Sequence, residues 1–281
     1  MTKSIFITGC SSGIGLCAAE TLHKKGYRVF ATVRKEEDAE KLRAQGIETL
    51  IMDVDNPTSI QQALTSVLAK TGGTLDFLFN NAGFAVPAAV EDLTHDMLQK
   101  QFETNVFGPT ILTNLVIPVM RKQGHGRIIQ NTSILGVITM PYRGAYNASK
   151  FALEALTSTL RQELRGVNIQ VSIIAPGPVK TKFRDNAYKS YRNVLLNKDS
   201  VHKTVYQNME KHFATESDGE KKVTASPEAV VEKLLHVLES PTPKARYYVG
   251  TPAHVFAFLR RILPDKGLDW VIAKVMGGET K

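Results

Sequence analysis

The sequence predicts an α/β fold built on a parallel, doubly wound sheet. Short apolar runs rich in β-formers alternate with helical patterns along the chain, which is typical of parallel strands with helices between them. The first apolar run leads through a glycine-rich turn straight into a helical pattern, as expected for the start of a strand–helix–strand unit. A length of 281 residues suits a single α/β unit with a large core.

Seven strands are expected. They lie within residues 3–8, 27–33, 46–54, 75–83, 126–133, 168–177 and 244–250. Helices are expected from the glycine turn to Gly26, over 57–70 with Asp55 or Asn56 near the cap, over about 93–121, and over 151–165. Residues 180–225 form the least regular segment, polar and rich in Tyr. Because this segment follows the sixth strand, it should lie at the carboxyl ends of the strands, where ligands bind in such sheets.

Composition narrows the class of protein. A hydrophobic content of 43% and a charged content of 22% indicate an ordinary soluble globular protein. Cys10 and Cys17 are expected to be reduced packing residues, and no residue cluster has metal-ligand spacing. The formal charge of +8 does not indicate nucleic-acid binding, because the basic residues are scattered and no nucleic-acid motif is present. Without a signal sequence or an apolar run of about 18 residues, the expected location is the cytoplasm.

The glycine-rich turn is a candidate phosphate site. Gly9, Gly13 and Gly15 follow the first strand and precede a helix, with Ser11, Ser12 and Ile14 between them. Glycines let backbone N–H groups and a helix N-terminus approach a pyrophosphate closely. The spacing is GxxxGxG rather than the common GxGxxG, so a plain tight turn is the alternative.

Tyr146 and Lys150 form a candidate acid/base pair. They stand four residues apart on an expected helix and therefore share a face. A free phenol has a pKa of about 10, and a nearby cation favours phenolate and lowers that pKa. The pair is therefore expected to exchange a proton with a substrate, whereas a surface Tyr beside a solvated Lys is the alternative.

Five motifs occur together in one order. They are TGCSSGIG, NNAG at Asn80 to Gly83, Ser133, the Tyr146/Lys150 pair, and PGPV at Pro176 to Val179. In this combination the chain resembles the short-chain dehydrogenase/reductase family over about residues 3–250, and most of all its bacterial aldehyde/ketone reductases and steroid and retinol dehydrogenases. The resemblance implies a single Rossmann-like domain, a nicotinamide cofactor and reversible hydride transfer between a carbonyl and an alcohol.

The resemblance also implies a catalytic set of Asn105, Ser133, Tyr146 and Lys150. Ser133, thirteen positions before Tyr146, would bond the substrate oxygen beside the phenol, with Thr132 as a weaker rival. In the family, the residue that matches Asn105 holds a water molecule, and this water links the lysine that matches Lys150 to solvent. Asn is also a poor residue for a helix interior, which favours a functional role at this position.

Cofactor choice depends on the end of the second strand. An acid there normally accepts the ribose 2′-OH of NAD, but Val33 occupies that position and is followed by Arg34 and Lys35. A guanidinium can grip a 2′-phosphate with two hydrogen bonds, so NADP(H) is favoured and NAD(H) is possible. Alternatively, Arg34 merely begins a solvated helix.

The family pattern assigns the remaining cofactor contacts. Asp53 and Val54 would lie by the adenine, Asn81, Ala82 and Gly83 by the ribose, Pro176 and Gly177 beside the nicotinamide, and Val179 and Thr181 at its carboxamide.

The expected substrate is an apolar aldehyde, ketone or alcohol. The residues that could line its site are Phe84, Val86, Ile134, Leu135, Val137, Met140 and Tyr142, with Phe183, Tyr188 and Tyr191 as a cover. A non-catalytic NADP-binding sensor or scaffold is the main alternative. A sugar-nucleotide epimerase is another, although the chain leaves little room for its larger substrate domain.

Two parts are expected: a catalytic NADP-binding domain over residues 1–250, with its substrate loop at 180–225, and a helical extension over 251–281. The extension reads as two amphipathic helices broken by Pro264 and Gly267. These helices could cover the cleft, contact an anionic membrane surface or join two copies of a homo-oligomer.

Overall fold

The computed structural model describes residues 2–276 except 184, 188, 190–198 and 215–222. Its centre is a seven-stranded parallel sheet in the order β3-β2-β1-β4-β5-β6-β7, which confirms the predicted fold class. The strands are β1 (Ser4–Ile7), β2 (Arg28–Val33), β3 (Glu48–Ile51), β4 (Phe77–Asn80), β5 (Gly126–Asn131), β6 (Ile169–Pro176) and β7 (Arg246–Val249).

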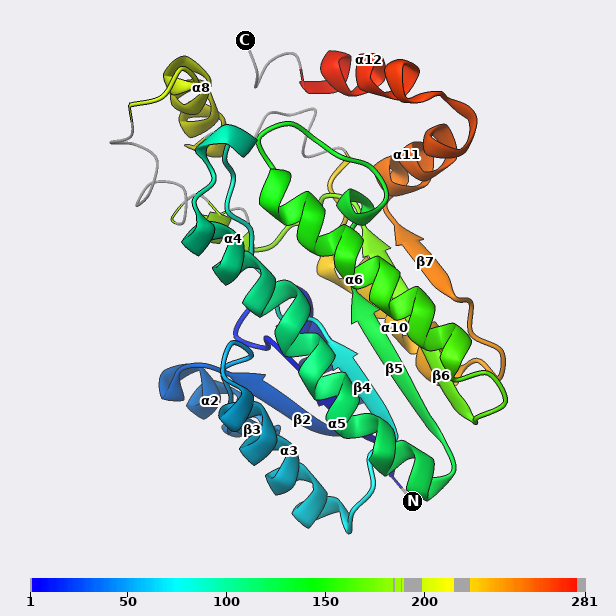
Figure 1. The fold of residues 1–281 in the computed structure, drawn as a ribbon. Coiled ribbons are helices and arrows are strands. Elements are labelled where there is room, and N and C mark those ends of the chain that lie inside the picture. The colour runs from blue at the N-terminus through cyan, green and yellow to red at the C-terminus, as the bar shows by residue number, and fades with distance from the viewer. Residues whose placement is uncertain (1, 184, 188, 190–198, 215–222, 277–281) are drawn as a thin grey trace.

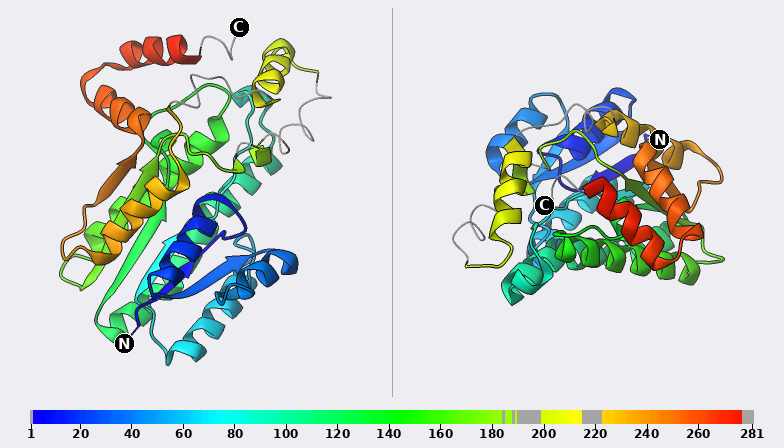
Figure 2. Two further views of the ribbon diagram at one scale, coloured as in Figure 1. Left: turned by 180° about the vertical axis from the view of Figure 1, so that it is seen from behind. Right: turned by 90° about the horizontal axis from the view of Figure 1, so that it is seen from above.

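Helices cover both faces of the sheet. One core cluster joins the strands to α1 (Gly13–Lys24), α2 (Glu36–Arg43) and α10 (Pro227–Glu239). The second joins the opposite face to α3 (Pro57–Thr71) and α5 (Gly108–Gln123) and to the end of α6 (Gly144–Glu163). Figure 1 shows α3, α5 and α6 in front of the sheet, and the view from behind in Figure 2 shows α1 and α10.

The carboxyl ends of the strands carry a separate group of elements. Helices α8 (Lys203–Ala214), α11 (Thr251–Ile262) and α12 (Asp265–Met276) gather there (Figures 1 and 2). The short turns η1 (Val90–Asp92) and η3 (Ile134–Gly136) belong to the loops beneath them. Among the described helices, none combines the length and apolar character that crossing a bilayer requires.

Several boundaries differ from the sequence prediction. The expected helix over 93–121 consists of α4 (His95–Phe102), a π-helical turn η2 (Glu103–Phe107) and α5. The irregular segment 180–225 contains α8, whose buried Tyr206 and Met209 give it an apolar face. The break between α11 and α12 lies at Leu263 and Pro264, whereas Gly267 is inside α12. A proline lacks the backbone N–H that would continue α11, so it ends the helix without help from a glycine.

The ends of two strands also fall earlier than expected. Asp53 and Val54 lie in the turn between β3 and α3 rather than at the strand end, and Ser133 follows β5 by two residues. Asn56 caps α3, since its side chain accepts a hydrogen bond from the Ser59 N–H at 3.1 Å. Cys10 and Cys17 are both free, and burial raises the pKa of the Cys10 thiol to about 12.

Candidate active site

The glycine turn is packed so tightly that Gly9 and Gly15 leave no room for a side chain. Gly9 and Gly13 have φ of 73° and 59°, in the left-handed region that favours glycine. A methyl group at Gly9 would lie 2.9 Å from the Cα of Ala82, and one at Gly15 would lie 2.2 Å from the Gly9 carbonyl oxygen. Ser12 precedes α1 without capping it by its side chain, and the first turn of α1 holds no acid. The exposed N–H groups and the close backbone therefore fit a pyrophosphate.

The loop after β6 reaches this turn. Thr181 lies against Gly13, where an added Cβ would be 3.0 Å from the Thr181 side chain. The Gly177 N–H donates to the Val249 carbonyl at 2.9 Å, and Val179 forms a bridge with Ala225. The fold thus brings Thr181 to the glycine turn, while Pro176 remains buried at the end of β6.

Asn81 acts as a clamp between three strand ends. Its amide donates to the Thr8 carbonyl at 2.9 Å, and its Oδ1 accepts from Asn131 at 2.9 Å. The Thr8 hydroxyl in turn accepts the N–H groups of Asn81 and Ala82. Sequence reasoning missed Asn131 and Thr8, although polar residues at two neighbouring strand ends were a usable signal.

Four predicted residues converge beside this clamp. Tyr146 and Lys150 come from α6, Asn105 from η2 and Ser133 from the N-terminus of η3, and all four are 9% exposed or less. The Lys150 Nζ lies 5.7 Å from the centre of the Tyr146 ring. Gly83 lies close to both Asn105 and Lys150. A methyl group on Gly83 would be 3.3 Å from Asn105 Oδ1 and 3.7 Å from Lys150 Nζ.

Burial controls the protonation of the central pair. It raises the pKa of Tyr146 to about 12, against a hydrogen bond with Ser133 that lowers it. It lowers the pKa of Lys150 to about 8, against the charge of Glu154 that raises it. The predicted lowering of the phenol pKa by Lys150 is therefore wrong for this structure. Desolvation of the buried phenol is the largest cause of the shift. The Lys150 ammonium donates a 2.9 Å hydrogen bond to the Asn131 carbonyl.

Asn105 locks the loop that follows β4. Its Oδ1 accepts the Phe84 N–H at 3.1 Å, and its Nδ2 donates to the Phe84 carbonyl and to Ser149 Oγ, each at 3.0 Å. It lies in the π-helical turn, where the regular helix is interrupted. Turns of this kind often occur at functional sites.

A buried network below Lys150 was not predicted. Glu154, 5% exposed, accepts a 2.6 Å hydrogen bond from the Thr132 hydroxyl and forms an ion pair with Arg246. The sequence did hold a signal for this network: Glu154 stands four residues after Lys150 on the same helix and therefore shares its face. The network holds β5, β7 and α6 together, and it occupies Thr132, the rival to Ser133.

Charge at the end of β2 favours an anionic partner. Val33 is buried, and the next two residues, Arg34 and Lys35, are exposed. The nearby Glu36 forms an ion pair with Arg43. Across the part of the chain that the structure describes, Arg34 has no ion pair of its own, so its guanidinium is available.

The turn after β3 is held by the Asp53 side chain and by the start of α5. Asp53 Oδ1 accepts the Asp55 N–H at 3.1 Å. Val54 meets the start of α5, since a methyl on Gly108 would lie 2.3 Å from the Val54 carbonyl oxygen. Both residues are partly exposed in this turn.

The predicted substrate residues divide into two clusters around Tyr146. The first packs under α8 and contains Phe84, Val86 and Tyr142, and the second packs on α11 and α12 and contains Ile134, Leu135, Val137 and Met140. Leu135 also packs on Tyr146. The Phe183 ring lies edge-on to the Tyr146 ring, with the two ring centres 5.6 Å apart. Tyr188 and Tyr191 lie outside the described residues.

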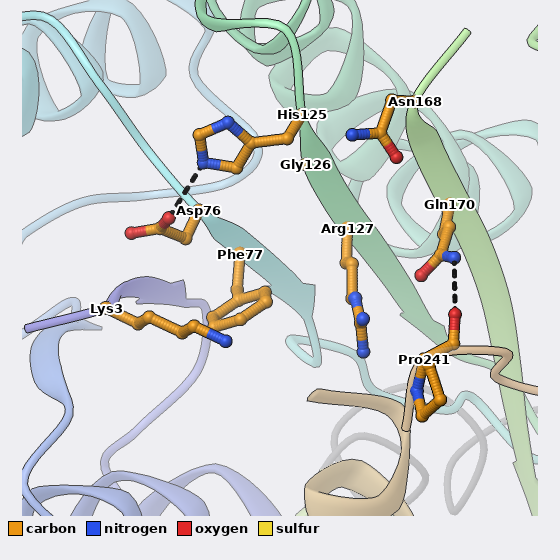
Figure 3. A pocket seen from close by; sticks show the side chains of 9 residues that line it. All are labelled: Lys3, Asp76, Phe77, His125, Gly126, Arg127, Asn168, Gln170 and Pro241. Carbon is orange, nitrogen blue, oxygen red and sulfur yellow. Dashed lines mark hydrogen bonds and ion pairs between the residues drawn. The ribbon is translucent and has the colours of Figure 1, made fainter. Parts of the chain in front are cut away.

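A cavity of about 210 Å³ lies at the amino ends of the strands (Figure 3). Lys3, Asp76, His125 and Arg127 are among its lining residues, and His125 contacts Asp76 at 3.1 Å. It lies at the opposite end of the strands from Tyr146 and so is separate from the candidate site. No group of three or more His, Cys, Asp and Glu side chains in the described ranges could hold a metal ion.

Comparison with known proteins decides the family. The family model for short chain dehydrogenases matches residues 3–192. The chain belongs to the short-chain dehydrogenase family. The matched residues run from β1 past β6 and include the glycine turn, Ser133 and the Tyr146/Lys150 pair, whereas α8, α11 and α12 lie beyond them.

Members of the short-chain dehydrogenase family are similar to nearly the whole chain. The uncharacterized oxidoreductase YbbO of Escherichia coli (strain K12) is 39% identical over 272 residues, which cover 97% of this chain and 94% of that protein. The NADPH-dependent 3-dehydrocapnine reductase of Ornithobacterium rhinotracheale is 33% identical and covers 95% of each chain. A crystal structure of a short-chain dehydrogenase from Streptomyces avermitilis has a TM-score of 0.78 at 26% identity and covers 99% of this chain and 96% of its own.

Proposed function

We propose that the chain is an NADP(H)-dependent oxidoreductase that interconverts an apolar aldehyde or ketone and its alcohol. The observation that carries the proposal is the convergence of Ser133, Tyr146 and Lys150 beside the glycine turn. The nicotinamide cofactor would supply hydride to the carbonyl carbon, or accept it in the reverse direction.

The chain's own residues handle the oxygen and its proton. Tyr146 donates its phenolic proton to the carbonyl oxygen as that oxygen gains negative charge, and the Ser133 hydroxyl donates a second hydrogen bond to it. Lys150 stabilises the phenolate that remains. Its ammonium is held in place by Asn131, and Asn105 fixes the loop that forms the opposite wall.

Cofactor residues follow from the same geometry. The backbone of Gly9, Ser11, Ser12, Gly13, Ile14 and Gly15 would hold the pyrophosphate, and the remaining predicted residues would contact the cofactor from the strand ends. The NADPH dependence in the name of the Ornithobacterium relative supports the choice of NADP(H). Steady oxidation of NADPH with a panel of aliphatic, aromatic, retinoid and steroid carbonyls tests the function. Saturable NADPH binding without turnover would instead support the sensor or scaffold.

Arg34→Asp is expected to weaken NADPH binding by about ten- to a hundredfold and to affect NADH much less. The reason is that an acid would replace the guanidinium beside the 2′-phosphate. Calorimetric titration with each cofactor measures the effect. Lys41→Asp makes the same charge change on an exposed part of α2 and should leave both affinities unchanged. A wild-type protein that prefers NADH would contradict the proposal.

We also propose that α11 and α12 contact an anionic membrane surface. Val255, Phe258 and Ile262 form one exposed stripe on α11, and Trp270 is 60% exposed on α12. The exposed residues Arg261, Lys266 and Lys274 supply the positive charge that anionic headgroups attract. An apolar substrate dissolved in the membrane would make this position useful.

The full chain is therefore expected to float with phosphatidylserine-containing vesicles at low salt. Phe258→Glu should lower the bound fraction several-fold, because it places a charge in the apolar stripe. Leu156→Glu changes an exposed apolar residue on α6 and serves as the matched control. If the wild-type chain stays with the dense fractions, the membrane contact is wrong.

A further inference from the structure

Glu154 is a buried carboxylate on the same face of α6 as Lys150. It stands four residues after Lys150, and side chains at this spacing are neighbours on a helix. Glu154 is 5% exposed and Lys150 is 4% exposed. The turn η3 closes over both residues, since a methyl group on Gly136 would lie 2.8 Å from Glu154 Cγ and 2.9 Å from the Lys150 carbonyl oxygen. Because little water reaches either side chain, the charge of one acts strongly on the other.

Both oxygens of the Glu154 carboxylate have partners from other elements. Oε1 accepts a 2.6 Å hydrogen bond from the Thr132 hydroxyl, just after β5, and Oε2 forms an ion pair with Arg246 of β7. Tyr248, also on β7, is the next titratable group beside Arg246. The cost of desolvating a buried ion pair offsets much of its attraction. Stability alone therefore does not account for a carboxylate at this position.

The charge of Lys150 depends on two opposing influences. Desolvation lowers its pKa to about 8, and the charge of Glu154 raises that pKa. Tyr146, whose ring centre lies 5.7 Å from Lys150 Nζ, is neutral at this pH because burial raises its own pKa to about 12. The Asn131 carbonyl that accepts the ammonium hydrogen bond carries no charge. In the described part of the chain, Glu154 is thus the charged side chain that favours the ammonium form.

We propose that Glu154 is a positioning residue that keeps the ammonium charge on Lys150 at neutral pH, with Arg246 limiting the negative charge that reaches the lysine. The proposal rests on the proposed function, in which a protonated Lys150 stabilises the Tyr146 phenolate. Without the charge of Glu154, burial acts unopposed, and Lys150 releases its proton at a lower pH. Without the charge of Arg246, the carboxylate acts on Lys150 alone, and the proton is held to a higher pH.

An NMR titration of Lys150 tests this assignment without turnover. The ε-carbon resonance of Lys150, in a chain with isotope-labelled lysine and assigned with Lys150→Met, should titrate near pH 8 in the wild type. In Glu154→Gln the midpoint should fall by about one pH unit, because Gln keeps the shape and an acceptor for Thr132 but not the charge. Glu163→Gln makes the same charge change at an exposed residue of α6 and should keep the wild-type midpoint.

Two variants of Arg246 test the same coupling even if Glu154→Gln does not fold. Arg246→Gln removes the positive charge and should raise the Lys150 midpoint, whereas Arg246→Lys keeps the charge and should leave the midpoint unchanged. A network with only a structural role would let water reach Lys150 when it is disturbed, and the midpoint would then rise in Glu154→Gln and in both Arg246 variants. That result, or an unchanged midpoint in both Gln variants, would overturn the proposal.

The pH dependence of the rate gives a second readout. The ratio of kcat/KM for carbonyl reduction at about pH 9 to that at about pH 6 should be about tenfold smaller in Glu154→Gln than in the wild type, because the ammonium form is lost earlier. If the Lys150 midpoint shifts as expected but no carbonyl is reduced, the effect of Glu154 on Lys150 stands and the oxidoreductase proposal fails. If carbonyls are reduced with the same pH profile in both proteins, the role of Glu154 is wrong and the oxidoreductase proposal stands.

Discussion

Tyr146→Phe is expected to lower kcat by about two to four orders of magnitude, the usual contribution of a general acid. The variant keeps the aromatic ring, which packs with Leu135 and Phe183, and removes only the hydroxyl that bonds with Ser133. NADPH affinity should stay within about twofold, because the glycine turn and Lys150 remain in place. Single-turnover kinetics together with a cofactor titration separate the two effects.

The control for this variant is Tyr27→Phe. Tyr27 packs against Phe77 near the amino ends of the strands, and its hydroxyl donates a hydrogen bond to the exposed Glu239. Its loss should leave kcat unchanged. A Tyr146→Phe variant that keeps more than about a tenth of the wild-type kcat would show that another group supplies the proton.

The sequence was sufficient for the fold because its signals are local. The central runs of the sheet are buried on both faces, so runs such as Phe77–Asn80 and Ile169–Pro176 read as continuous strands. The glycine turn and the Tyr146/Lys150 spacing are equally local. Their convergence with Ser133 and Asn105 followed from a parallel sheet, whose carboxyl ends meet at one edge.

The sequence was insufficient where long-range packing decides the outcome. Nothing near Tyr146 in the chain shows that it becomes buried, so the direction of its pKa shift was missed. Glu154 is an ordinary helix acid until Arg246 of β7 and Thr132, just after β5, bind its carboxylate. Helix α8 was missed for a similar reason. Its Tyr206 hydroxyl bonds the buried Asp92 and so anchors a polar segment on η1.

Lys150→Met is expected to have two effects that no single structural role would produce. It removes the ammonium beside the phenol and so should lower kcat by about a hundredfold or more. It should also weaken NADPH binding by about tenfold if the same ammonium bonds the nicotinamide ribose. Steady-state rates and cofactor titrations measure both.

The same variant tests the cost of burying the ammonium. Burial lowers the pKa of Lys150 from 10.5 to about 8. Between these two values the unfolded chain holds more protons than the folded chain, so the stability of the wild type should rise with pH in this window. The Met variant lacks this group, and its free energy of unfolding should rise less over the same range. Below about pH 8 both states of the wild type carry the charge, and the Met variant should be the more stable of the two.

Urea unfolding at several pH values from about 7 to about 10 measures this difference. Tyr146 acts in the opposite direction only above about pH 10, because its raised pKa makes the folded chain hold more protons there. Lys41→Met, at an exposed residue of α2, should have the same pH profile as the wild type. Parallel profiles for the wild type and Lys150→Met would mean that Lys150 is not desolvated, and the account of the central pair would then fail.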